Sequence, residues 1–311
     1  MLRGDAIWCP IGTDVVTVYC GLPPQDIIVA DCTPADLAWL RSLDGLSPWS
    51  LAVERARSSG ARRAGALIRA LLRTGGLDDA ASMPDSWRFS SRRQATDRSA
   101  LLDSGLTPWE ANDQIDRRHS CVVAIIGTGY PAELAFQWCR EAGLDPRPAN
   151  LNDEERPPGT RIALLIEIGH PLVVSGVDTA WHAIPHLPVR LLGTSARVGP
   201  LVRPGLSGCL RCAHLHAVDR WRHWAERAWQ AQSVVRPTLP DQTAGWDSAT
   251  GHLVISLAVR MIRSACDGED HPAGQPGIAY DIEDHDAIPR AIAQPPHPLC
   301  GCQWDQANPA A

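Results

Sequence analysis

Four cysteines form two closely spaced pairs, Cys209–Cys212 and Cys300–Cys302, far apart in the sequence. Each pair can place two sulfur atoms on one tight turn, and four thiolates complete a tetrahedral zinc site with Zn–S distances of about 2.3 Å. The alternative is a disulfide or coincidence, because the chain contains ten cysteines. We predict a structural zinc ion, since four protein ligands leave no position for a reactive water.

The composition narrows the class of protein. At 311 residues the chain suggests two domains with substantial cores. It shows no signal peptide and no apolar run of about 18 residues, so we expect a cytoplasmic protein with no membrane segment. Reduced thiols in that compartment favour metal over disulfides. The net charge of −6 argues against a nucleic-acid partner, and the absence of lysine excludes a lysine Schiff base or phosphate clamp.

The first 82 residues are predicted to form three strands and then three helices. The strands are rich in β-branched residues and comprise Ala6–Cys9, Val15–Cys20 and Asp26–Asp31. Thr33-Pro34 and Ser47-Pro48 are typical helix starts, and the third helix is predicted over Arg62–Thr74. Three strands with a cluster of three helices indicate a winged-helix domain.

The third helix has two different faces. Its apolar face carries Leu67, Ile68, Leu71 and Leu72, and its other face carries Arg62, Arg63, Arg69 and Arg73. A winged helix with such arginines could contact DNA. Equally, the third strand and this helix could form a groove that takes an extended peptide as an added strand. A solvated charged face is the alternative to both.

Residues 83–118 show no sustained apolar period and are predicted to be a linker. From residue 119 buried strands are predicted at Cys121–Ile126, Arg161–Glu167 and Pro188–Leu192. A short crossover helix is predicted over Val177–Leu187. The most apolar helix, about Thr250–Cys266, could be core or a homodimer interface.

A glycine-rich turn follows the first of these strands. Gly127 and Gly129 open a Gly-x-Gly-x-x-Ala stretch between a strand and a helix, as in Rossmann-like nucleotide sites. Such a site also needs an acid about 20 residues later, at the end of a second strand. Asp145 and Asp153 are near that distance, but Asp145–Asn150 is a poor strand because it contains two prolines. A tight turn with nothing bound is therefore an equal alternative.

Several C-terminal motifs together resemble the ThiF-like relatives of ubiquitin-activating enzymes from thiazole/oxazole-modified peptide clusters. The matching stretches are Pro185–Val189, Val198–Pro200, Pro204-Gly205, Cys209–Cys212, Asp219–Trp221 and His297–Cys302. The N-terminal pattern resembles the winged-helix recognition element of enzymes that modify ribosomally made peptides. The resemblance implies an α/β fold: a winged-helix (α+β) peptide-recognition domain (1–82), a linker (83–118), and a Rossmann-like ThiF-type domain with a zinc site (119–311).

The resemblance also implies a function. Such proteins bind the leader of a precursor peptide and present it to a separate YcaO-type, ATP-dependent cyclodehydratase that forms azolines. The zinc ligands would be the four cysteines. By position, the leader contacts would be Asp26, Ile27, Ile28, Val29, Ala30, Asp31, Arg62, Arg63, Ala66, Leu67, Arg69, Ala70 and Arg73.

The chain departs from the adenylating members of that family. They hold ATP and magnesium with an acid-rich segment, an Asn-x-x-Arg-Gln stretch and a lysine, whereas Leu151–Pro158 lacks this pattern. The resemblance therefore implies a non-catalytic subunit without ATP, in which Gly127 and Gly129 are a vestige of the nucleotide loop. Two rivals remain: an active enzyme that adenylates a peptide carboxylate, and a zinc-containing winged-helix DNA-binding regulator.

Overall fold

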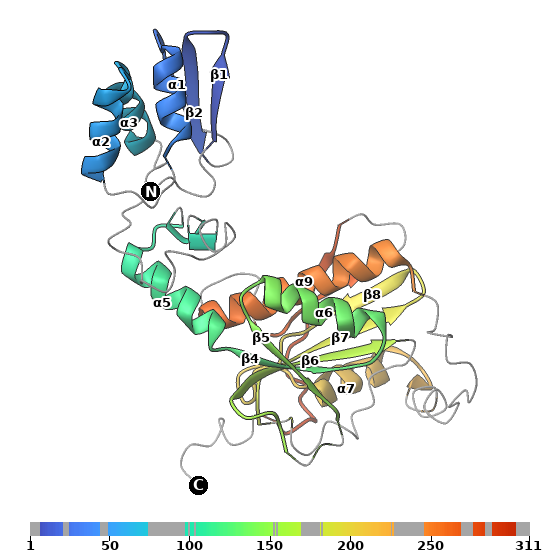
Figure 1. Cartoon of the computed structure of the whole chain (residues 1–311). Coiled ribbons are helices and arrows are strands. Elements are labelled where there is room, and N and C mark those ends of the chain that lie inside the picture. Colours follow the sequence, from blue (N-terminus) through green and yellow to red (C-terminus); the bar gives the residue numbers. More distant parts are fainter. Residues whose placement is uncertain are drawn as a thin grey trace. The chain divides into compact units, whose positions relative to one another are not determined.

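The computed structural model describes residues 7–20, 25–43, 49–73, 97–98, 100–102, 104–151, 153, 155–168, 181, 183–224, 226, 246–268, 276–283 and 288–302. The fold is mixed α/β, as predicted, and divides into two compact units, Met1–Ile115 and Asp116–Ala311 (Figure 1). Each unit has its own hydrophobic core. Within the described ranges, the helices are too short or too polar to cross a lipid bilayer.

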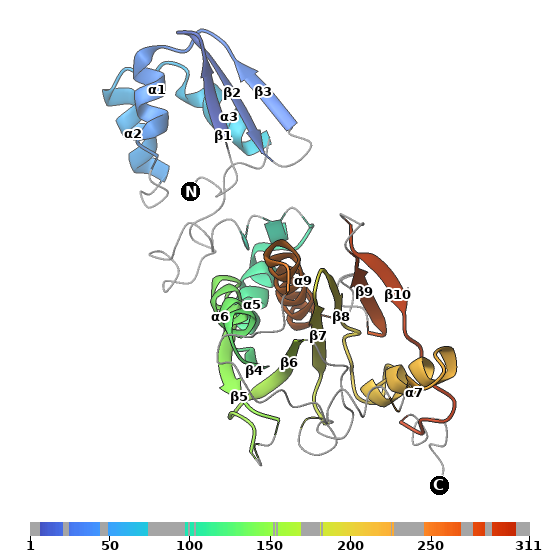
Figure 2. The same cartoon turned by 90° about the vertical axis from the view of Figure 1, so that its right-hand side faces the viewer.

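The first unit contains a three-stranded antiparallel sheet in the order β1-β2-β3, followed by three helices (Figure 2). The elements are β1 (Ile7–Ile11), β2 (Val15–Cys20), β3 (Gln25–Val29), α1 (Pro34–Arg41), α2 (Trp49–Ser58) and α3 (Ala64–Arg73). All six were expected from the sequence. Strand β1 continues through Pro10, where a break was expected, because an edge strand tolerates a residue without an N–H donor.

Helix α1 is fixed to the helices around it by polar contacts. Thr33 and Asp36 form a capping box, in which each side chain accepts a hydrogen bond from the other residue's backbone N–H. The second carboxylate oxygen of Asp36, which is fully buried, accepts the backbone N–H of Arg63 at 2.6 Å. Trp39 Nε1 donates to the carbonyl of Ala52 at 2.8 Å. These contacts tie the start of α1 to the start of α3 and to α2.

The core of the first unit lies between the sheet and α3. Val16, Val18 and Val29 face Leu67 and Leu71 there. Placing Leu72 on the buried face of α3 was wrong, because its side chain is 60% exposed. The buried stripe runs instead through Ala64, Leu67, Ala70 and Leu71, and the small alanines let the helix approach the sheet.

Helix α5 (Pro108–His119) lies inside the stretch for which a linker was expected. It begins with a capping box between Thr107 and Glu110, and Ala111 and Ile115 are buried against Leu101. The sequence pattern does not predict this helix, because so few of its twelve residues are apolar. Trp87 and Phe89 lie outside the described residues.

The second unit is built on a seven-stranded sheet in the order β10-β9-β8-β7-β6-β4-β5. The strands are β4 (Val122–Ile126), β5 (Asp145–Ala149), β6 (Thr160–Ile168), β7 (His186–Leu192), β8 (Ser195–Val198), β9 (Ile278–Ile282) and β10 (Arg290–Ala293). Strands β5, β4, β6 and β7 are parallel, and β8, β9 and β10 extend the sheet in antiparallel fashion. Helices α6 (Tyr130–Glu141) and α9 (Ser248–Asp267) cover one face, and α7 (Leu210–Arg220) lies on the other (Figures 1 and 2).

Strand β5, the segment of the expected crossover helix and helix α9 can each be compared with the sequence prediction. The segment Asp145–Ala149, judged a poor strand, is strand β5; it tolerates two prolines because it is the edge of the sheet. The described part of the expected crossover helix is bend, turn and the start of β7, while residues 177–180 and 182 lie outside the described ranges. Helix α9 is a core helix, since it packs on α6, β7 and β8 and buries Val254, Ile255 and Met261 completely.

Candidate functional site

The four predicted cysteine ligands come together in the second unit. The Sγ atoms of Cys209 and Cys212 are 3.8 Å apart, and those of Cys209–Cys300 and Cys212–Cys302 are 3.4 Å apart. All four sulfur atoms lie within 4.8 Å of one another. A tetrahedron with Zn–S distances of about 2.3 Å has edges of about 3.8 Å, whereas a disulfide needs about 2.05 Å. The cluster therefore fits a zinc ion, and all four thiols are free of disulfides.

Two elements supply the cysteines. Cys209 is the N-cap of α7 and Cys212 lies in its first turn, while Cys300 and Cys302 follow β10. A helix N-terminus favours negative charge and so favours thiolates. Burial raises the pKa of the Cys212 thiol. Backbone N–H groups of His297 and Cys209 and the neighbouring thiols act in the opposite direction, and the net effect is a lowered pKa.

His297 joins the two halves of the cysteine cluster, a role that the sequence did not assign to it beyond its place in the matching stretch His297–Cys302. The N–H of Leu299 donates to His297 Nδ1 at 3.1 Å, so the imidazole is the tautomer with its proton on Nε2, which donates to Asp219 at 2.9 Å. His216 lies edge-on to His297 and contacts the carbonyl of Pro295. These contacts hold α7 against the C-terminal segment. The available signal was that Asp219 and His297 lie close in sequence to the two cysteine pairs.

The predicted glycine turn lies at the end of β4. A Cβ atom at Gly127 would lie 2.9 Å from Cβ of Ile166 on β6, so this glycine is needed for the close packing of two strands. Gly129 is the N-cap of α6, with φ 72°. The next residue, Tyr130, stacks on Trp246 with 6.0 Å between ring centroids, and its hydroxyl lies 3.2 Å from Nε2 of His252. The turn therefore has a packing role that requires no bound nucleotide.

Asp145 and Asp153, the two acids that could complete a nucleotide site, each have a structural partner nearby. Asp145 is paired with Arg147 at the start of β5, where the closest N–O distance is 2.9 Å. Asp153 follows the end of β5 and accepts the backbone N–H of Asn150 at 2.7 Å. Both carboxylates thus have local structural partners.

The candidate peptide-binding residues lie on or beside β3 and α3. Residues 26–29 are in β3 and residues 30–31 follow it, while residues 62–63 precede α3 and residues 66, 67, 69, 70 and 73 lie on it or at its end. Strand β3 pairs with β2 along one edge, and its other edge pairs with no strand in the described part of the chain. Leu67 and Ala70 are inside the core, so they position α3 and cannot reach solvent.

The arginines of this region are not equivalent. Arg63 forms an ion pair with Asp31, so each is committed to the other. Arg62, Arg69 and Arg73 are exposed and have no ion pair with any described residue. Ala66, Arg69 and Arg73 follow a helical spacing of three and four residues on α3, and Arg62 lies in the turn just before the helix. We call Arg62, Arg69 and Arg73 the arginine stripe.

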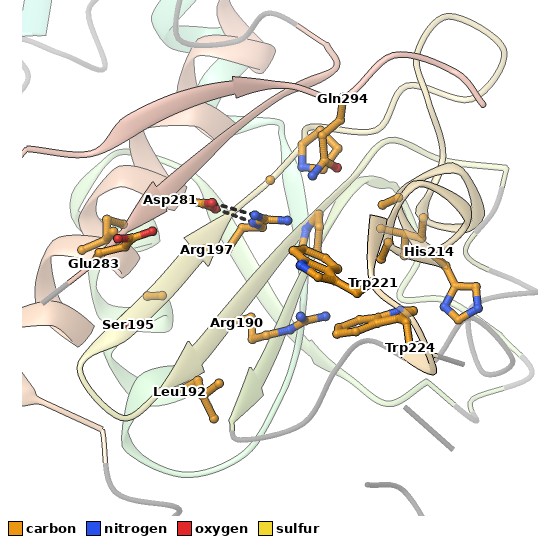
Figure 3. A pocket seen from close by; sticks show the side chains of 18 of the residues that line it. Arg190, Leu192, Ser195, Arg197, His214, Trp221, Trp224, Asp281, Glu283 and Gln294 are labelled. Atoms are coloured by element: carbon orange, nitrogen blue, oxygen red, sulfur yellow. Dashed lines mark hydrogen bonds and ion pairs between the residues drawn. The ribbon is translucent and has the colours of Figure 1, made fainter. Parts of the chain in front are cut away.

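A pocket of about 710 Å³ lies between α7 and the antiparallel part of the large sheet (Figure 3). Arg190 and Arg197 project into it, and Arg197 is paired with Asp281 through two hydrogen bonds. Ala213, Ala217, Trp221 and Trp224 form the opposite wall, together with His214. Sequence reasoning missed this site, and the available signal was one charged residue, Arg190, inside the apolar strand β7.

The structure resembles several solved structures over nearly its whole length. The heterocyclase TruD aligns with 96% of this chain at a TM-score of 0.56 and 15% identity, and a heterocyclase in complex with substrate and cofactor aligns with 97% at 0.56 and 14%. The chain spans only 42% and 39% of those two proteins. The microcin C7 biosynthetic enzyme MccB in complex with N-formylated MccA aligns with 97% of this chain at 0.53 and 13% identity, and 99% of MccB is covered. No family model matches, and no curated protein matches in sequence. At these identities the likeness establishes the fold.

Proposed function

We propose that this chain binds the leader of a ribosomally made precursor peptide and presents it to a separate, YcaO-type, ATP-dependent cyclodehydratase. The chain itself would be a non-catalytic subunit, with one structural zinc ion held by the four cysteines. Its first unit would be a winged-helix peptide-recognition domain. The observation that carries the proposal is the likeness, over almost all of the chain, to heterocyclase and microcin-biosynthesis structures.

This chain covers 42% of the heterocyclase TruD. Under the proposal, azoline formation would be carried out by the partner cyclodehydratase and not by this chain. Leader binding would raise the local concentration of the core peptide near the partner's active site to about the millimolar range.

The edge of β3 that pairs with no described strand would give the leader a place to bind. An extended peptide can add to such an edge through backbone hydrogen bonds, while side chains alternate between the groove and solvent. Arg69 and Arg73 of the arginine stripe lie on α3, which packs against β3, and Arg62 lies just before α3. Three arginines with no ion-pair partner among the described residues would select a leader with acidic side chains on the groove side, and they would also fix its register.

The test is a titration of the labelled leader of the precursor peptide encoded beside this gene with the full chain. Binding is measured by fluorescence polarisation. We expect saturable binding at about micromolar Kd or tighter. Reversing charge at Arg69 and Arg73 together should weaken binding about tenfold or more, with unfolding unchanged. A matched variant with Arg55 and Arg57 reversed on α2 has the same change in net charge and should bind normally. Equal weakening in both variants would show that only net charge matters, and would move the groove elsewhere.

The second candidate is an enzyme that adenylates a peptide carboxylate. It is favoured by the alignment with MccB, which covers 97% of this chain and 99% of MccB. This MccB structure was solved with ATP and aligns at a TM-score of 0.53 and 13% identity. The discriminating assay is ATP–pyrophosphate exchange by the chain alone, with the precursor peptide present. Exchange that survives the Arg69 and Arg73 reversal would establish the enzyme and make leader capture unnecessary for it.

A further inference from the structure

Arg190, on β7, is a half-buried cation whose Nε atom is fully buried. No described residue forms a hydrogen bond or ion pair with it. Burial lowers the pKa of this guanidinium. A buried charge without a hydrogen-bonding partner is costly to a folded protein, so such a group calls for an anion.

The neighbouring charged groups do not satisfy Arg190. Cross-strand pairing places Glu167, Arg190, Arg197 and Asp281 in one row across β6, β7, β8 and β9. Arg197 and Asp281 are joined by two hydrogen bonds and neutralise each other. Burial raises the pKa of Glu167 to about 7 despite the opposing field of Arg190, so this carboxyl is only partly ionised near neutral pH. Glu167 therefore offsets the charge of Arg190 only in part, and no ion pair joins Arg190 to a described residue of the row.

The pocket above this row has room for a small molecule. Its volume of about 710 Å³ is in the range of ligand sites. Ala213 and Ala217 on α7 are small and keep the helix from filling the space. Trp221 and Trp224 continue the same wall, with their rings 5.4 Å apart, and Arg190 points toward Trp224 (Figure 3). The indole N–H of Trp224 is also buried without a hydrogen-bond partner.

We infer that this pocket binds a small monocarboxylate with a planar, apolar body. The carboxylate would accept hydrogen bonds from the guanidinium of Arg190, and the planar body would lie against Trp221 and Trp224. A doubly charged phosphate fits less well, because Arg190 is the one arginine of the described pocket lining without an ion-pair partner and Glu283 adds a carboxylate at the pocket wall. The site lies wholly in the second unit and is independent of the proposed leader groove.

The zinc site and the pocket share a helix. Cys209 and Cys212 hold the first turn of α7, and the pocket uses residues of the same helix from Leu210 to Ala217. The hydrogen bond from His297 to Asp219 holds the last turn. A ligand in the pocket would therefore contact a helix whose position depends on the metal.

The test is titration of the full, zinc-loaded chain with phenylacetate and indole-3-acetate, followed by ligand-observed NMR. Phenylacetamide, which has the same shape without the charge, and inorganic phosphate are the controls. We expect saturable binding of the carboxylates at concentrations up to about 10 mM, and binding of the amide at least tenfold weaker. Arg190→Gln should weaken carboxylate binding at least tenfold, whereas Arg147→Gln, at an exposed arginine of the same unit, should leave it unchanged.

A second variant covers the case in which Arg190→Gln does not fold. Ala213→Leu should fill the pocket from α7 without touching the charged row, and it should abolish binding. The assignment is overturned if neither carboxylate binds the folded chain, if the amide binds as well as the acid, or if phosphate binds in their place. Binding that persists in both variants would place the ligand at another site and would equally refute the assignment.

Discussion

The sharpest prediction concerns the cysteine cluster. Replacing Cys302 with serine removes one of four thiolates and leaves a hydroxyl that stays neutral at pH 7. The sulfur separations of 3.4–3.8 Å are already within about 0.4 Å of a zinc–thiolate tetrahedron. Little rearrangement is therefore needed to bind the ion, so most of the binding free energy should appear as stability of the second unit.

The magnitude follows from the number of ligands. Structural zinc sites contribute about 10–16 kcal/mol of apparent binding free energy at pH 7, which is about 3 kcal/mol for each of four ligands. We expect Cys302→Ser to weaken zinc binding by about two orders of magnitude. For a unit of this size, a loss of about 3 kcal/mol lowers the midpoint of thermal unfolding by about 6–12 °C.

The assay measures zinc per chain by mass spectrometry of the purified protein and the midpoint of thermal unfolding. Wild type should hold one zinc ion per chain, and a chelator should lower its midpoint toward that of the variant. Cys9→Ser, which removes a thiol from the first unit, should keep both zinc and midpoint. If Cys302→Ser retains one zinc ion and melts as wild type does, the metal assignment is wrong and the thiols are only packed together.

Two further predictions concern the second unit. Gly127→Ala should lower the free energy of unfolding in urea by about 1–3 kcal/mol, because its Cβ would lie 2.9 Å from Ile166 Cβ; unchanged stability would mean that this glycine has no packing role. Glu167 has a folded-state pKa of about 7, above its ordinary value of 4.5, so its contribution to stability is full below pH 4.5 and is lost as the pH rises through 7. The loss amounts to about 3 kcal/mol at most, and Glu167→Gln should flatten the fall of the urea midpoint between pH 5 and 8; an equal fall in both proteins would contradict this.

The glycine turn shows how one motif supports two explanations. Glycine at position 127 would be required for a phosphate to approach the backbone, and it is also required for β4 to pack beside Ile166. The stability of Gly127→Ala measures the packing role directly, whereas the exchange assay measures the catalytic one. Together the stability measurement and the exchange assay distinguish a turn that serves packing from a site that binds a nucleotide.

Local patterns in the sequence predicted much of the fold. The β-branched stretches became β1, β2 and β3, the Thr33-Pro34 pair began α1, and the apolar run at residue 121 became β4. The paired cysteines predicted their own cluster. Close spacing already holds the two sulfurs of each pair near one another, so the fold needs only to bring the two pairs together. These features depend on interactions within a few residues, which a sequence displays directly.

The tertiary structure decided the rest. Strand β5 exists despite two prolines because it lies at the sheet edge, and the position of a strand in a sheet is set by its neighbours. Leu72 has the spacing of a core residue but faces solvent, since packing selects one side of α3. The row from Glu167 to Asp281 joins four strands from three distant stretches of the chain. Strand pairing brings those charges together, so a lone charged residue in an apolar strand could not by itself reveal the pocket above them.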